Sequence, residues 1–147
     1  MSQSDDRLKH RDLTERIIGV FYEVYNELGH GFIESVYETA LELALSAHGL
    51  NVQRQIDIEV WFRGKRVGKF AADMLIEKCV LIELKACRTL DPAHESQLLN
   101  YLRATEIEVG MLVNFGLKPQ FKRFAFDNAR KTVQAGSLLE KLLRAAK

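Results

Sequence analysis

Hydrophobic residues recur along the chain with two different periods, and the change of period separates helical from extended segments. From about Asp12 or Thr14 to Gly29 they recur every three to four positions, which predicts an amphipathic helix. The stretch from about Ile33 to His48 has the same period and a broader apolar stripe, so it predicts a second helix. We expect both helices to pack against a sheet.

The middle of the chain alternates apolar and polar residues, as half-buried strands do. Ile56, Ile58, Val60 and Phe62 alternate with polar residues and are expected to share one face of a strand. A turn at 63–65 leads to a strand that carries residues 70–76, and a third strand follows within CVLIELKA, residues 79–86. Short turns connect the three strands, which predicts an antiparallel meander.

The rest of the chain alternates between helix and strand. Asp91 before Pro92 is typical of a helix start, and this helix is expected to run to about Thr105. The apolar run from Val109 to Phe115 does not alternate, which predicts a strand buried on both faces. A strand around 121–126 and a helix around 138–144 complete the chain. The order predicts a mixed α/β (α+β) fold, a β-sheet flanked by helices.

Length and composition indicate one soluble domain. Residues 1–12 are polar and are expected to be a disordered tail, and a single domain is expected over residues 13–147. No apolar stretch approaches the roughly 20 residues of a membrane span, and the N-terminus lacks a signal-peptide core, so a cytoplasmic location is expected. Cys79 and Cys87 have no metal-ligand spacing and are expected to be reduced thiols.

The charge balance limits how the chain can meet nucleic acid. A net charge of +1 and a pI near 7.8 argue against a protein that coats nucleic acid, for which a pI above about 9 is usual. Two basic clusters are either local phosphate contacts or solvated surface charge: Lys65, Arg66 and Lys69, and Lys118, Lys122 and Arg123.

Three charged residues interrupt the apolar strands, and burying charge there is costly unless it is paired or bound to a metal. In VLIELKA, Glu83 and Lys85 share a face, while the opposite face is purely apolar. A hairpin centred on Lys78 makes Asp73 and Glu83 cross-strand neighbours, where like charges repel. A cation between them would remove the repulsion, and oxygen ligands without His or Cys suit Mg²⁺ or Mn²⁺.

A second interpretation of these three charges needs no metal. Lys85 would form a salt bridge with one carboxylate, and the other carboxylate would point to solvent from an edge strand.

Polar residues on the neighbouring helices extend the pattern. His94, Gln97 and Tyr101 share one helix face and suit either contacts to a phosphate, a bound water or a base, or a structural role. Glu34 stands in the first turn of the second helix, and Tyr37 follows it. Either Glu34 is a carboxylate that stabilises the helix N-terminus while Tyr37 lies in the core, or Glu34 is a further acidic member of the metal site.

The segment from Gly31 to Tyr37, Gly-Phe-Ile-Glu-Ser-Val-Tyr, resembles the signature that names the GxxExxY protein family, a branch of the PD-(D/E)XK nuclease superfamily. The resemblance spans about residues 14–126 and continues through Ala72-Asp73, Ile82 to Ala86, His94 to Leu102, and Val113 to Gly116.

The resemblance implies a restriction-endonuclease-like core with a divalent-metal site. Asp73 and Glu83 would bind the ion, and Lys85 would help to activate water. Glu34 would extend the metal site, and Gln97 would complete the catalytic set from the following helix.

We therefore expect a nuclease that needs Mg²⁺ or Mn²⁺ and hydrolyses phosphodiester bonds of DNA or RNA. Tyr101, His94 and Tyr37 are expected to contact the substrate. Two alternatives stay open: a catalytically silent nuclease fold that acts through nucleic acid or a protein partner, and hydrolysis of another phosphate ester. A homodimer would suit the cutting of two strands.

Overall fold

One mixed sheet organises the molecule, with the strand order β5-β4-β3-β2-β1-β6. The computed structural model describes residues 9–132, 134–135 and 137–145. The strands are β1 (Val52–Phe62), β2 (Lys65–Ile76), β3 (Val80–Lys85), β4 (Val109–Phe115), β5 (Pro119–Ala125) and β6 (Gln134–Ala135). β3 and β4 run parallel, and every other neighbouring pair is antiparallel. The predicted mixed sheet and its antiparallel meander are confirmed.

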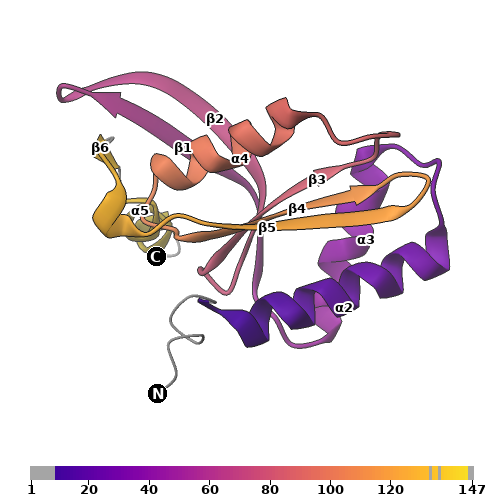
Figure 1. Ribbon diagram of the computed structural model, residues 1–147. Coiled ribbons are helices and arrows are strands. Elements are labelled where there is room, and N and C mark those ends of the chain that lie inside the picture. Colours follow the sequence, from indigo (N-terminus) through magenta and orange to yellow (C-terminus); the bar gives the residue numbers. More distant parts are fainter. Residues whose placement is uncertain (1–8, 133, 136, 146–147) are drawn as a thin grey trace.

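Helices cover both faces of this sheet. They are α2 (Arg11–Leu28), α3 (Glu34–Ala47), α4 (Pro92–Arg103) and α5 (Leu138–Ala145), and a 3-10 turn lies at Asn128–Arg130. In Figure 1, α4 lies on one side of the sheet and the α2–α3 pair on the other. Among the described residues, no helix is long and apolar enough to cross a membrane.

The start of α2 differs slightly from the expected boundary. The helix begins at Arg11, so residues 11 and 12 are helical and do not belong to a tail. The expected tail otherwise falls mostly on residues 1–8, which lie outside the described residues. Gly29 ends α2 with a positive φ of 68°, a conformation that favours glycine, as the sequence indicated.

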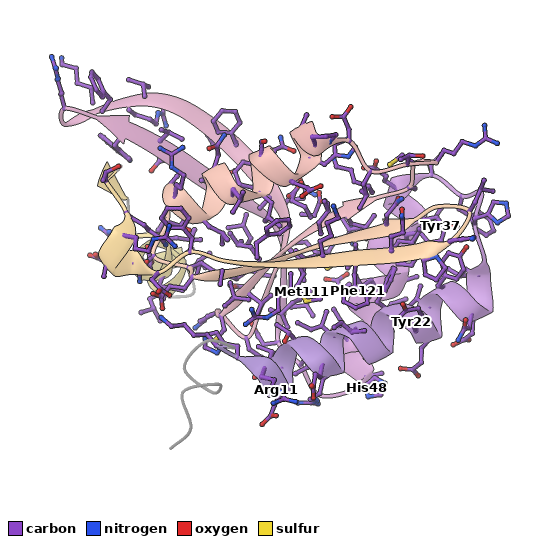
Figure 2. All side chains as sticks on the ribbon, viewed as in Figure 1. Arg11, Tyr22, Tyr37, His48, Met111 and Phe121 are labelled. Atoms are coloured by element: carbon purple, nitrogen blue, oxygen red, sulfur yellow. The ribbon has the colours of Figure 1, made fainter. Side chains whose placement is uncertain are left out.

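Two apolar cores lie on opposite faces of the sheet. The core under α2 and α3 contains Val80, Ile82 and Leu84 of β3, whereas Leu81 belongs to the core under α4 and α5. The period-two alternation predicted for β3 is therefore confirmed. β4 is buried along its whole length, as its unbroken apolar run predicted. In Figure 2, Tyr22 of α2 lies against Phe121 of β5, with ring centroids 6.3 Å apart.

The β2–β3 hairpin has the register expected from a turn centred on Lys78. Leu75 is the partner of Leu81 and Met74 is the partner of Ile82. Lys78 has a positive φ of 55°, which turns the chain tightly enough for a three-residue connection. The same register continued by one residue sets Asp73 opposite Glu83, although the paired ladder stops at Met74.

The alternation of β2 reverses at Asp73. Ala72 belongs to the core under α4, but Met74, two residues later, belongs to the core under α2 and α3. On β1, Gln55 lies between the residues paired with Ala72 and Met74 and has a left-handed φ of 52°. Both strands are therefore irregular at the level of the acidic pair, which period-two counting does not reveal.

A second irregularity lies farther along β1. The register of β1 against β2 shifts between Val60 and Trp61. Along the face expected for alternate residues of β1, Ile56 and Ile58 are buried, whereas Phe62, the last residue of the strand, is 57% exposed.

Candidate active site

Asp73 and Glu83 are linked by two hydrogen bonds that run between the strands. The backbone N–H of Asp73 donates to Oε1 of Glu83 at 3.0 Å, and the backbone N–H of Leu84 donates to Oδ2 of Asp73 at 2.7 Å. The two carboxylates thus accept backbone donors where the regular ladder has ended. One oxygen of each carboxylate is used in this way, and Oδ1 of Asp73 and Oε2 of Glu83 remain as further acceptors.

Burial makes this pair electrostatically unfavourable when both groups are charged. Glu83 is only 4% exposed and Asp73 is half-buried. Burial first, and the nearby Asp73 carboxylate second, raise the pKa of Glu83 to about 8. Burial also raises the pKa of Asp73, against the lowering effect of the Leu84 N–H. The site therefore favours either a proton or a cation.

Lys85 is the positive charge nearest to this pair along β3. It is half-buried, and its charge lowers the pKa values of both Asp73 and Glu83. Within the described part of the chain it forms no ion pair within 4.0 Å. β3 is also an interior strand between β2 and β4. The interpretation as a salt bridge on an edge strand is therefore wrong.

Asn114 fixes the chain directly after Lys85. It is fully buried and is the register partner of Lys85 on β4. Its Oδ1 accepts the N–H of Cys87 at 3.0 Å, and its Nδ2 donates to the Cys87 carbonyl at 2.9 Å and to Gln120 Oε1 at 3.3 Å. The sequence offered one signal for this role, a polar residue inside an apolar strand, which the sequence interpretation did not use.

Helix α3 presents two carboxylates toward the site. Glu34 lies exposed in its first turn and raises the pKa values of Asp73 and Glu83 through its charge. Glu38, one turn later, has a stronger effect on the pKa of Asp73. The sequence interpretation missed Glu38, although its spacing of four from Glu34 places both on one helix face.

Glu38 is held by two residues of β1. Its Oε2 accepts from Arg54 Nη2 at 2.9 Å, and its Oε1 accepts from the side chain of Gln55 at 2.8 Å. Arg54 also pairs with Glu42 at 3.1 Å. These contacts tie α3 to β1 at the level where the strands lose their regular alternation, so they support the irregular backbone beside Asp73.

Tyr37 has a different position from the one expected of a substrate-binding residue. It is fully buried, and in Figure 2 it lies between α3 and the sheet, where it stacks on Phe115 with ring centroids 4.3 Å apart. Its hydroxyl donates to the Gly29 carbonyl and accepts the N–H of Phe32. A ring with no exposed surface cannot contact a substrate, so that expectation was wrong. Tyr37 instead holds the loop that leads to Glu34.

The three predicted residues of α4 fall into two groups. His94 forms a capping box with Asp91, because its Nδ1 accepts the Asp91 N–H at 3.2 Å. Gln97 and Tyr101 instead line a groove beside the site. Burial, and then the charges of Glu83 and Asp73, raise the pKa of Tyr101 to about 12, so its hydroxyl stays protonated at neutral pH.

The donor set suits a hard divalent cation at the acidic pair. Two carboxylates stand together without His or Cys, a composition preferred by Mg²⁺ and Mn²⁺. A cation would also offset the burial and repulsion that raise the pKa of Glu83. No ready cluster of three or more His, Cys, Asp or Glu is found in the ranges that the structure describes, so Glu34 is not gathered with the pair.

Three of the six residues in the basic clusters are paired with acidic neighbours. Arg66 bonds to Glu59 at 3.1 Å, and Lys122 bonds to Glu95 at 2.7 Å. Lys69 lies 3.5 Å from Asp57. These ion pairs favour solvated surface charge over dedicated phosphate contacts for those three residues. Both cysteines are free thiols, as predicted.

Comparison with known proteins adds a family and a fold. No curated protein matches the chain. A solved structure titled "Crystal structure of SSO0001" matches with a TM-score of 0.50 and 22% identity, over 78% of this chain and 59% of that one. This likeness supports the fold, a mixed sheet flanked by helices. The model of the PD-(D/E)XK nuclease superfamily matches residues 11–124, a range that contains the acidic pair, Lys85 and Gln97. The chain therefore belongs to the PD-(D/E)XK nuclease superfamily.

Proposed function

We propose that the protein is a divalent-metal-dependent nuclease that hydrolyses phosphodiester bonds of nucleic acid, in the GxxExxY branch of its superfamily. The observation that carries the proposal is the pair Asp73 and Glu83, joined by backbone hydrogen bonds in the sheet interior, with Lys85 two residues further along β3. Buried like charges cost stability, so their presence favours a chemical role. The assignment to the GxxExxY branch is supported by the three residues of its signature, Gly31, Glu34 and Tyr37.

Asp73 and Glu83 are the residues that would hold Mg²⁺ or Mn²⁺, since each carboxylate uses only one oxygen to accept a backbone N–H. Such an ion, when bound, lowers the pKa of a coordinated water and neutralises charge at the phosphate. Glu34 adds negative charge at the margin of this site, and as an exposed first-turn residue it acts on the ion directly or through water.

The other residues position the reactants. Lys85 orients the attacking water and stabilises charge that develops on the phosphate. Its half-buried ammonium is available for this role, since it forms no ion pair with any of the described residues. Gln97 contacts the phosphate or the water from α4. Tyr101 donates a hydrogen bond from its protonated hydroxyl. His94 contacts the substrate backbone through the ring nitrogen that the capping box leaves free.

The decisive experiment compares two lysines. Purified protein with Mg²⁺ or Mn²⁺ degrades DNA or RNA, and Lys85→Ala abolishes this while the melting temperature stays within a few degrees of the wild type. Lys65→Ala is the matched control, because Lys65 is exposed on the β1–β2 hairpin and, within the described residues, has no ion pair. Undiminished hydrolysis by Lys85→Ala would refute the assignment.

A further inference from the structure

A groove of about 560 Å³ lies between α4 and the β1–β2 hairpin, on the sheet face that carries Glu83. Val60 and Phe70 form the wall on the strands, and one face of α4 forms the other wall. Figure 1 shows this hairpin extending past the end of α4. The volume lies in the range of sites for small molecules, roughly 300–1,000 Å³.

The walls of the groove combine aromatic surface with amide groups. Phe70 is 48% exposed, and its ring is tilted by 44° to that of Tyr101 at a centroid distance of 6.0 Å. Along α4, Ser96, Gln97 and Asn100 supply hydroxyl and carboxamide groups that both donate and accept hydrogen bonds. A flat heterocycle with donors and acceptors on its edge matches this combination.

Charge distinguishes the groove from the acidic pair beside it. Arg103 is the charged residue among those that line it, and its Nη1 donates to Asn100 Oδ1 at 3.2 Å. Tyr101 belongs to the groove and also lies within the electrostatic field of Glu83 and Asp73. A ligand whose phosphate lies near the carboxylates therefore places the group next to that phosphate in the groove. There it meets the aromatic rings of Phe70 and Tyr101 and the guanidinium of Arg103.

The geometry points to a nucleobase as the occupant: the groove binds one unpaired base of the substrate, which stacks on Phe70 and bonds by its edge to Gln97 and Asn100. The inference rests on the proposed nuclease function, because it assigns the groove to the substrate of that site. A base within a duplex has its faces stacked and its pairing edge occupied, so it cannot enter. The substrate class is accordingly single-stranded nucleic acid, or nucleic acid with an unpaired nucleotide.

The test measures binding separately from hydrolysis. Short single-stranded DNA and RNA of one sequence, each carrying 2-aminopurine, and a blunt DNA duplex are titrated with the full chain in EDTA. The wild type binds the single strands more tightly than the duplex and quenches the 2-aminopurine. Phe70→Ala weakens single-strand binding about tenfold and removes the quenching. Phe70→Trp retains both, because it keeps a stacking face. The DNA and RNA arms identify the preferred sugar.

Two further variants distinguish a loss of base binding from an effect on folding. Phe62→Ala binds as the wild type does, since Phe62 is exposed on the same hairpin but does not line the groove. Ser96→Trp fills the groove from an exposed helix position and weakens binding as Phe70→Ala does. Equal binding by Phe70→Ala and Phe62→Ala, or duplex binding as tight as single-strand binding, would overturn the inference.

The outcomes separate this inference from the proposed function. Hydrolysis with Mg²⁺ that is indifferent to Phe70 and Ser96 substitutions leaves the nuclease standing and removes the base-binding groove. Binding of single strands that depends on Phe70, without hydrolysis under any metal condition, retains the groove and removes the nuclease.

Discussion

Glu83 accepts the backbone N–H of Asp73 at 3.0 Å, so one member of the acidic pair holds the main chain of the other. The return bond, from the N–H of Leu84 to Asp73, makes the arrangement reciprocal. Both carboxylates are therefore structural acceptors as well as candidate ligands. Substitutions that remove an oxygen acceptor will disturb the strands, whereas substitutions that remove only the charge test the chemistry.

The first prediction concerns pH and Glu83. Its folded-state pKa is about 8 against an ordinary value of 4.5, so between these values the folded protein keeps a proton that the unfolded chain releases. The free energy of unfolding of the metal-free protein therefore falls as pH rises from about 4.5 to about 8. Glu83→Gln keeps an oxygen that accepts the Asp73 N–H, and its free energy of unfolding does not show this fall with pH.

Thermal unfolding in EDTA measures the effect. The melting temperature of Glu83→Gln exceeds that of the wild type at pH 8, and the gap narrows toward pH 5. Glu77→Gln, on the exposed β2–β3 turn, is the control for loss of one carboxylate. A gap that is constant across this pH range would contradict the assigned role of Glu83.

The second prediction concerns the divalent ion. Mg²⁺ or Mn²⁺ raises the melting temperature of the wild type, because binding to the folded state alone stabilises it. The increase is larger at pH 8 than at pH 5, since protons compete for Glu83 at the lower pH. Asp73→Asn loses the increase, and calorimetric titration with Mn²⁺ gives an independent measure. Metal binding that is unchanged in Asp73→Asn would place the ion elsewhere.

The third prediction uses two glycines of the β4 region. A Cβ at Gly116 would overlap the carbonyl oxygen of Cys87 and crowd Asn114, whereas at Gly110 it would meet the flexible side chain of Leu98 at 2.9 Å. Gly116→Ala therefore costs about 3 kcal/mol and Gly110→Ala about 1 kcal/mol in the free energy of unfolding. Denaturant unfolding measures both. Gly116→Ala also lowers hydrolysis, because it displaces the segment after Lys85.

Gly19→Ala completes this series. Gly19 lies inside α2, and a methyl group added there would meet no atom within 4 Å beyond the backbone of its own helix. Alanine at this position therefore stabilises the fold by about 0.5–1 kcal/mol. If Gly110→Ala and Gly116→Ala lowered the free energy of unfolding equally, overlap with the Cys87 backbone would not explain the effect at Gly116.

Much of the site followed from local sequence pattern. The short turn at Lys78 set the hairpin register, and the alternation in β3 separated Glu83 from the apolar face. Periodicity of this kind depends only on neighbours along the chain, so it can be read without tertiary contacts. The substrate role expected of Tyr37 was wrong, because the full enclosure of its ring depends on segments far apart in the chain.

The sequence by itself determined the order of the elements, the hairpin centred on Lys78 and the adjacency of Asp73 to Glu83, since short turns and side-chain periodicity act within a few residues. The tertiary structure decided the rest. The reversal of β2 at Asp73, the support from Glu38 on α3 and the groove beside Tyr101 each join segments far apart in the chain. Such contacts form only when helices pack on the sheet. Packing decides between tertiary arrangements that are all compatible with the local sequence pattern.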